Sequence, residues 1–314
     1  MHDLVTLGEV LLRLAVPPPG RIETARQLDV QIGGAEANVA ATCARLGLRT
    51  AWISALPDNV WGERVRRELN SHGVDCSYVA TLSGARLGAY FVEYGVAPRA
   101  TQVLYDRRDS AFARLTFDLV DWVPVRRAQL VHVSGVTPAL GHNSRALVRH
   151  LVEEASALSF DMNYRAALWT PDQARDFAES ILPRVRYFFL GRDEARIVFR
   201  MGGPPEAVLE SLASLAPKAT IALLQGEEGS TVLDAGRLWK PAKEYRVQMI
   251  DPIGAGDAYA AGFLWCALKG RGTQDCVDAG SAVAALKCAA WGDIAIITER
   301  DVAQALSGGP DVRR

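Results

Sequence analysis

A regular alternation of short apolar runs with longer amphipathic stretches constrains the fold of this chain more than any other feature. The apolar runs fall at 130–133, 158–160, 187–190 and 221–224, and the helical stretches at 144–157, 172–182, 193–200 and 205–215. Strand-like runs at 4–7 and 51–53 flank a further helical run at 35–46. Strands this apolar are typical of a parallel sheet covered by helices on both faces. We therefore predict an α/β fold, with a three-layer α/β/α core around a mainly parallel sheet.

Two segments, 11–32 and roughly 85–110, do not follow this alternation. They contain strand-like sequence interrupted by prolines and show no helical period. We expect β strands outside the main sheet, which would form a small lid or an oligomer surface, because an uncovered apolar sheet edge tends to aggregate. No internal repeat or linker divides the chain, so we predict a single domain over 1–314 with this β appendage.

Composition excludes several classes of protein. Of 314 residues, 49% are hydrophobic and 23% are charged, and the formal net charge is −1, which disfavours nucleic acid or an acidic membrane surface as the main partner. The longest apolar stretch, 258–268, is shorter than the roughly 18 to 20 residues that span a bilayer. The five cysteines form no C-x-x-C pair and are predicted to be buried thiols. With no signal-peptide pattern at the N-terminus, we expect a cytoplasmic protein.

Lysine is scarce, and this excludes one common route to phosphate binding. The 35 basic residues include only five lysines, of which Lys218 is the first. A P-loop needs a glycine-rich turn that ends in Lys-Ser or Lys-Thr, and no lysine here is followed by either residue. A GC-rich genome is enough to explain most of the arginines.

The segment Asp251-Pro252-Ile253-Gly254-Ala255-Gly256-Asp257 directly precedes the apolar helical stretch. A turn of small residues that opens a helix presents backbone N–H groups at the positive end of the helix dipole, and so favours an anion. Asp257 would lie in the first helical turn, facing that anion. Taken alone, the motif is better explained by a glycine turn followed by a capping aspartate.

A second motif, Gly33-Gly34-Ala35-Glu36-Ala37-Asn38, lies near the start of the chain. In this order and at this chain length, the two motifs closely resemble the signatures of the ribokinase (PfkB-type) family of sugar kinases. The resemblance extends from residue 7 to residue 293. It implies a ribokinase-like core and an ATP-dependent carbohydrate kinase.

The resemblance implies that Gly254, Ala255 and Gly256 form an anion hole for the transferred phosphoryl group. Asp257 would be the base that accepts the proton of the attacking hydroxyl. An aspartate with its ordinary pKa of about 3.9 is a weak base. Phosphoryl transfer needs the proton only late, so orientation matters more than basicity.

The resemblance also implies the nucleotide site. It assigns ATP contacts to Asn163, Arg165, Gln225, Gly226, Glu228 and Gly229, as well as to Gly254 and Gly256. The family often has Lys where this chain has Gln225, and usually Asn where it has Gly191. Glu194 is retained and would organise Mg²⁺ through water. The resemblance therefore implies Mg²⁺ with ATP, and leaves open a monovalent cation.

For the acceptor, Tyr105-Asp106-Arg107 resembles a Tyr-x-Arg element of the members that phosphorylate 2-keto-3-deoxygluconate to 2-keto-3-deoxy-6-phosphogluconate. An arginine can bind the carboxylate of a sugar acid bidentately, although Arg107 could also be an ordinary surface arginine. The substrate contacts implied by the resemblance are Gly34, Asn38, Tyr90, Tyr105, Arg107, Arg165, Asp257 and Asp293.

Two alternatives remain at this stage. The element Asn163, Arg165, Leu168 and Trp169 is shared with fructokinases, so a fructokinase or another ketose kinase stays open. A sugar-acid-binding sensor without catalysis is the alternative of another class, and the retained Asp257 argues against it. The resemblance further implies a homo-oligomer formed through the β lid.

Overall fold

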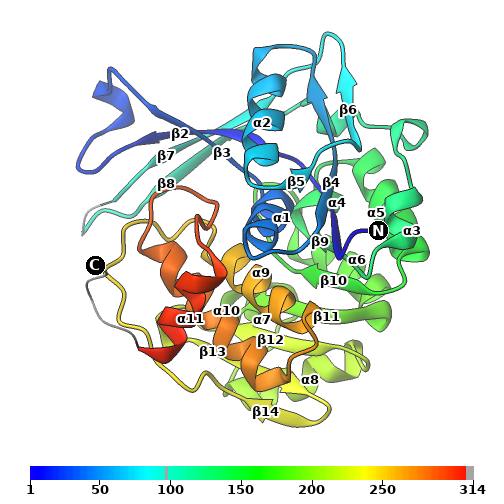
Figure 1. Cartoon of the computed structure of the whole chain (residues 1–314), viewed down its shortest axis with the longest axis vertical. Coiled ribbons are helices and arrows are strands. Elements are labelled where there is room, and N and C mark those ends of the chain that lie inside the picture. The colour runs from blue at the N-terminus through cyan, green and yellow to red at the C-terminus, as the bar shows by residue number, and fades with distance from the viewer. Residues whose placement is uncertain (96–97, 309–314) are drawn as a thin grey trace.

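The computed structural model describes residues 1–95 and 98–308 (Figure 1). Its main sheet runs from one edge to the other in the order β14-β13-β12-β11-β10-β9-β1-β4-β5, with β6 also paired to β4. The strands are β1 (Leu4–Leu7), β4 (Thr50–Pro57), β5 (Val74–Asp75), β6 (Val79–Leu82), β9 (Leu130–Ser134), β10 (Leu158–Asp161), β11 (Val185–Gly191), β12 (Thr220–Leu224), β13 (Ser230–Asp234) and β14 (Arg237–Trp239). From β5 to β12 every pairing is parallel, and β13 and β14 add an antiparallel edge.

Helices cover both faces of this sheet, because successive side chains of a buried strand point to opposite sides. In β11, Phe188 and Leu190 face one apolar cluster and Phe189 faces another. The helices on the first side are α5 (His142–Glu154), α6 (Pro171–Ile181), α7 (Arg192–Val198) and α8 (Pro205–Leu215). Those on the second side are α1 (Ala35–Arg45), α2 (Val60–Ser71), α9 (Ala255–Leu268) and α10 (Thr273–Cys288). The predicted three-layer core is confirmed.

Local sequence explains where these helices begin and how deeply they lie. Thr170 and Gln173 form a capping box at the start of α6, and Pro171 occupies its first position. Helix α9 is apolar on nearly every side and is buried accordingly, packed against α10 and α1. The five cysteines are buried and free, as predicted. The shorter helices are α3 (Val123–Arg127), α4 (Val136–Ala139) and α11 (Glu299–Ser307).

A second, four-stranded sheet projects from the core beside α1 and α2 (Figure 1). Its order is β3 (Asp29–Gly33), β2 (Leu11–Val16), β7 (Gly88–Glu93) and β8 (Gln102–Asp106). We call it the small sheet. The prediction of strands outside the main sheet at 11–32 and 85–110 is confirmed, and β3 extends one residue further. Residues 96–97 and 309–314 of the predicted ranges lie outside the described residues.

Parallel pairing sets the position of the functional residues. The carboxyl ends of β1, β9, β10, β11 and β12 meet along one edge of the main sheet, where ligands of open α/β sheets bind. Within residues 1–95 and 98–308, no helix has the length and apolar character needed to cross a membrane.

Candidate active site

The Gly254–Gly256 turn opens helix α9. Gly254 has a left-handed φ of 85°, and a Cβ atom there would overlap the carbonyl oxygen of Asp293. Glycine is therefore required both by conformation and by space. A Cβ atom at Gly256 would meet nothing within 4 Å. The turn is thus closely packed at Gly254 and open at Gly256. An anion site at the start of a helix needs such open space.

Asp257 lies in the first turn of α9 and is only 8% exposed. Its two carboxylate oxygens accept hydrogen bonds from different amide side chains. Asn38 of helix α1 donates to Oδ2 at 2.7 Å, and Asn163, which follows β10, donates to Oδ1 at 3.1 Å. The backbone N–H of Gly34 in turn donates to Oδ1 of Asn38 at 3.3 Å. Two separate segments of the chain, at 34–38 and at 163, therefore orient the carboxylate of a third.

The pKa of Asp257 is raised to about 7, mainly by burial and to a lesser extent by the neighbouring carboxyl groups of Asp293 and Glu36. The hydrogen bond from Asn38 and the charge of Arg165 oppose this rise. The expectation of an ordinary aspartate pKa is wrong, because the sequence does not show how completely α1 and β10 shield this carboxyl group. A carboxylate with this pKa is a competent general base at neutral pH.

On the β10 side, the chain is folded back by a short loop. Asn163 has a left-handed φ of 39°, and its backbone N–H donates to Asp161 at 3.2 Å. Glu194 at the start of α7 accepts from the backbone N–H of Tyr164 at 2.6 Å and from that of Gly191 at 2.7 Å. One half of a capping box is thus present, because Glu194 accepts from the backbone N–H of Gly191, which has no side chain for the other half. Arg165 projects from this loop and is exposed.

Two carboxyl groups here have strongly perturbed titration. Burial raises the pKa of Asp161 well above its usual value, and the charges of Glu194 and Asp257 add to the rise. Burial also raises the pKa of Glu194. Mg²⁺ usually keeps several waters and binds one or two carboxylates together with substrate phosphates. The carboxyl groups of Asp161 and Glu194, which repel each other, fit that mode of binding. Within the described ranges, no group of three or more His, Cys, Asp or Glu side chains is arranged to hold a metal ion alone.

The turn after β12 contains Gln225 and η5 (Gly226–Glu228). The side chain of Gln225 accepts a hydrogen bond from Thr231 at 2.8 Å, and so is directed back to the neighbouring strand. Glu228 forms a bidentate ion pair with Arg192, at 2.8 and 2.7 Å. Position 225 lacks the lysine that the family often has there. The positive charge beside this turn comes from Arg192 instead.

Tyr90 and Asp293, both predicted substrate contacts, lie next to each other. The hydroxyl of Tyr90 donates to Oδ2 of Asp293 at 2.6 Å. Arg13 of the small sheet donates to Oδ1 of Asp293 at 2.6 Å and to Oδ2 of Asp251 at 2.6 Å. The guanidinium of Arg13 is fully buried, and Trp291 lies 5.2 Å from it. A buried ionic network thus joins the small sheet to the catalytic loops.

Arg107 follows β8 and is paired with a carboxylate that sequence reasoning did not select. Its Nε donates to Glu9 at 2.8 Å, and its Nη2 donates to the same oxygen. Ser110 donates to the other oxygen of Glu9. The ring of Tyr105 lies 5.5 Å from the guanidinium. Arg107 is therefore held by its partners on one edge, while its Nη1 group is directed elsewhere.

Sequence reasoning also missed Arg13, Asp251 and Lys287 as members of the site. Arg13 and Lys287 lie in segments for which the sequence predicted only a structural role. Asp251 lies in the motif before Asp257, but no separate role was predicted for it. A signal was present for Lys287, because it is the single charge between residues 279 and 292 of a mainly apolar stretch. Arg13 carried a comparable signal, because it is the single charge between residues 10 and 20, but nothing nearby in the sequence indicated its partners.

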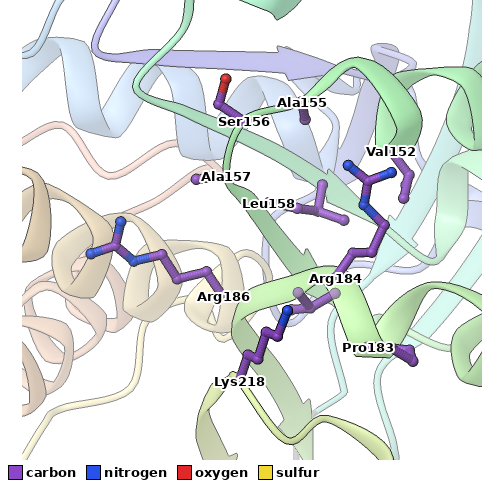
Figure 2. A pocket seen from close by; sticks show the side chains of 10 residues that line it. Val152, Ala155, Ser156, Ala157, Leu158, Pro183, Arg184, Arg186 and Lys218 are labelled. Carbon is purple, nitrogen blue, oxygen red and sulfur yellow. The ribbon is translucent and has the colours of Figure 1, made fainter.

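A cavity elsewhere on the molecule has no part in this site. It has a volume of about 470 Å³ and is lined by residues that include Leu158, Val185 and Lys218 (Figure 2). Leu158 and Val185 are the first residues of β10 and β11. The cavity therefore lies at the amino ends of these strands, on the edge of the sheet opposite to Asp257.

Comparison with known proteins agrees with this geometry. The chain matches the pfkB family of carbohydrate kinases over residues 1–300, and it belongs to that family. Its class is thus a carbohydrate kinase.

Among individual proteins, it is 38% identical to a 2-dehydro-3-deoxygalactonokinase of Haloferax volcanii, over 98% of this chain and 97% of that protein. It is 30% identical to a 2-dehydro-3-deoxygluconokinase of Thermoproteus tenax, over 93% and 90%. The crystal structure of a 2-dehydro-3-deoxygluconokinase from Thermotoga maritima superposes with a TM-score of 0.92 at 29% identity, covering 98% and 100%. The predicted family and fold are confirmed.

Proposed function

We propose that this kinase transfers the γ-phosphoryl group of ATP to the primary hydroxyl of 2-keto-3-deoxygluconate, a 2-keto-3-deoxy sugar acid. The observation that carries the chemistry is the buried Asp257 carboxylate, oriented by Asn38 and Asn163 directly beside the Gly254–Gly256 turn. The position of Arg107, held by Glu9 next to Tyr105, carries the choice of a sugar acid.

In the proposed reaction, the acceptor hydroxyl oxygen forms a bond to the γ-phosphorus as the bond to the bridging oxygen of ADP breaks. Asp257 accepts the hydroxyl proton late in this step. Backbone N–H groups of the Gly254–Gly256 turn stabilise charge that spreads over the phosphoryl oxygens. Catalysis of this kind depends on positioning, which the two amide hydrogen bonds to Asp257 supply.

For the nucleotide, we propose that Asn163 and Arg165 contact the phosphates, and that residues 225–229 follow the nucleoside. Mg²⁺, when bound, would neutralise phosphate charge, and we propose that Glu194 and Asp161 would hold it through water. Since Glu228 is paired with Arg192, we expect the nucleotide to meet this ion pair rather than a free carboxylate.

For the acceptor, we propose that Arg107 binds the sugar carboxylate through its Nη1 group. An arginine has five N–H donors, and Glu9 uses those of Nε and Nη2. Gly34, Tyr90 and Asp293 would contact the hydroxyl groups. A neutral ketose offers no charge to Arg107, which disfavours a fructokinase.

A second acceptor has specific support. The relative with 38% identity is named for the galactonate compound, the C4 epimer of the gluconate compound. Both epimers carry the same carboxylate and primary hydroxyl, so Arg107 and Asp257 would serve either one.

The deciding experiment is a coupled assay of ADP release with both epimers, fructose and ribose as acceptors. We expect turnover of a sugar acid, and we expect Arg107→Gln to raise its KM about tenfold or more, because a charge-assisted hydrogen bond is lost. Arg108→Gln, which changes an exposed neighbour, is the matched control. Turnover of fructose without either acid would refute the substrate, and binding of the acid without turnover would favour a sensor.

A further inference from the structure

Lys287 is a fully buried lysine directly behind the anion turn. It belongs to α10, and its side chain is 0% exposed. Its ammonium group donates to the backbone carbonyl oxygen of Asp251 at 2.8 Å and lies 3.7 Å from Oδ1 of the same residue. Asp251 is only three residues before Gly254. The charge of Lys287 therefore lies within the structure that holds the beginning of the turn.

The carboxylate of Asp251 is satisfied without Lys287. Oδ2 accepts from Arg13 at 2.6 Å and from the backbone N–H of Gly292 at 3.0 Å, and Oδ1 accepts from the backbone N–H of Ile253 at 3.0 Å. The hydrogen bond that only Lys287 supplies is therefore the one to the backbone carbonyl oxygen of Asp251. Burial lowers the pKa of Lys287, while Asp251 and Asp293 oppose that change.

A buried ammonium group is costly, and a well-packed apolar residue at such a place is often equally stable or more so. The contact with the loop carbonyl gives this cation a role that an apolar residue could not fill. Helix α10 also fixes the same loop through the carbonyl oxygen of Cys288, which accepts from the backbone N–H of Ile250 at 2.9 Å and of Asp251 at 3.2 Å.

A monovalent cation at this loop does not fit the residues present. Such an ion exchanges its water shell for several carbonyl or carboxylate oxygens. The carbonyl and both carboxylate oxygens of Asp251 already accept hydrogen bonds from Lys287, Arg13 and two backbone N–H groups. The place that a cation would take beside Asp251 is occupied by the ammonium group.

We propose that Lys287 is a positioning residue that supplies, as part of the chain, the positive charge behind the Gly254–Gly256 turn, so that phosphoryl transfer needs no monovalent cation. The inference rests on the proposed role of this turn in binding the transferred phosphoryl group. It concerns how the turn is held, and it does not depend on which sugar acid is the acceptor.

The first test uses the unmodified protein. Turnover is measured in potassium, sodium and tetramethylammonium chloride at equal ionic strength. We expect the three rates to agree within about twofold. Activation by potassium of about tenfold or more would overturn the proposal.

The second test uses Lys287→Ala, which removes the ammonium group and leaves room for a small cation. We expect kcat to fall about tenfold or more, with the KM of the sugar acid nearly unchanged, and methylammonium or potassium to restore part of kcat. Lys287→Met fills the same space without charge and should lose kcat without rescue. Lys269→Ala, at an exposed ion pair with Glu299, is the control.

Thermal unfolding supplies a readout that does not need activity. Methylammonium or potassium should raise the unfolding temperature of Lys287→Ala and leave that of the unmodified protein unchanged, because only the variant has a vacant cation site. A merely structural lysine predicts no rescue of kcat and no cation-specific stabilisation, and that result would overturn the proposal. If no sugar acid is turned over, the proposed substrate fails while this thermal comparison still decides the role of Lys287. If the variants do not fold, the cation dependence of the unmodified protein decides it.

Discussion

Replacing Asn38 by alanine tests how the fold sets the basicity of Asp257. Asn38 is buried, and it donates the shorter of the two amide hydrogen bonds to the carboxylate, at 2.7 Å against 3.1 Å from Asn163. The substitution removes a donor that stabilises only the ionised form. Burial, which is the larger influence, stays. The pKa of Asp257 should therefore rise above its value of about 7.

The size of the change follows from the strength of the lost bond. A hydrogen bond to a charged group contributes about 1.5 to 3 kcal/mol, and about 1.4 kcal/mol corresponds to one pH unit. We expect the acid limb of kcat/KM for the sugar acid near pH 7 in the unmodified protein, because the pKa of Asp257 is raised to about 7. In the variant this limb should move up by about one to two pH units. At neutral pH the variant should lose activity, and at high pH it should regain most of it.

The assay is a pH profile of kcat/KM from coupled ADP release, with Asn70→Ala, an exposed asparagine on α2, as the control. Recovery at high pH separates a change in basicity from simple misfolding, because a misfolded protein would stay inactive at every pH. An acid limb at the same pH in Asn38→Ala and in the unmodified protein would refute this account of Asp257.

Four further predictions concern Asp257, Gly254 and the small sheet. Asp257→Asn should lower kcat by about 10² to 10⁴ while ATP binding, measured by calorimetry, is retained; an active variant would remove Asp257 from the mechanism. The same variant should unfold at a higher temperature than the unmodified protein at pH 8, with a smaller difference at pH 4. The folded-state pKa of Asp257 is raised, so its ionisation makes the fold less stable as the pH rises from about 4 to about 7. Gly254→Ala should abolish detectable turnover and lower the unfolding temperature, since its φ of 85° and the carbonyl of Asp293 leave no room for a methyl group; Gly202→Ala, with open space around it, is the control. Light scattering should give the mass of a homo-oligomer that pairs through the small sheet, where Leu104 and Tyr105 are exposed, and a monomeric mass would count against that assembly.

The fold could be predicted from the sequence because the patterns that indicate it are local and recur along the chain. Apolar runs alternating with helical stretches predict a parallel sheet whatever the details of each strand, and the two irregular segments predict the small sheet. The order of the strands was less accessible. It places β1 between β4 and β9. The β1–β9 pairing joins residues more than 100 positions apart, such as Leu4 and Leu130, and no local pattern contains that relation.

The residues of the candidate site could be predicted from the sequence only where they belong to one continuous motif. The turn before Asp257 and the glycine pair before Asn38 are read directly, whereas the partners that determine their properties come from distant segments. Glu9 meets Arg107, and Arg13 meets Asp251, across separations of 98 and 238 residues. The pKa of Asp257 depends on such neighbours and on burial, so residue type alone gave the wrong value.

The buried network around Arg13 limits how the acceptor preference of this kinase can be changed. The small sheet carries Tyr90 and Tyr105, which are predicted acceptor contacts. On that prediction, replacing the sheet by the corresponding segments of another family member would be the direct way to transfer specificity. Arg13 would leave with the graft. Asp293 would lose the cation that pairs with it, and Asp251 would keep only Lys287. Breaking a buried ion pair in this way costs about 3 to 5 kcal/mol, a large part of the stability of a typical domain. A functional chimera would therefore have to exchange the residues at 251 and 293 together with the strands, so that sugar recognition and the catalytic loop are inherited as one unit.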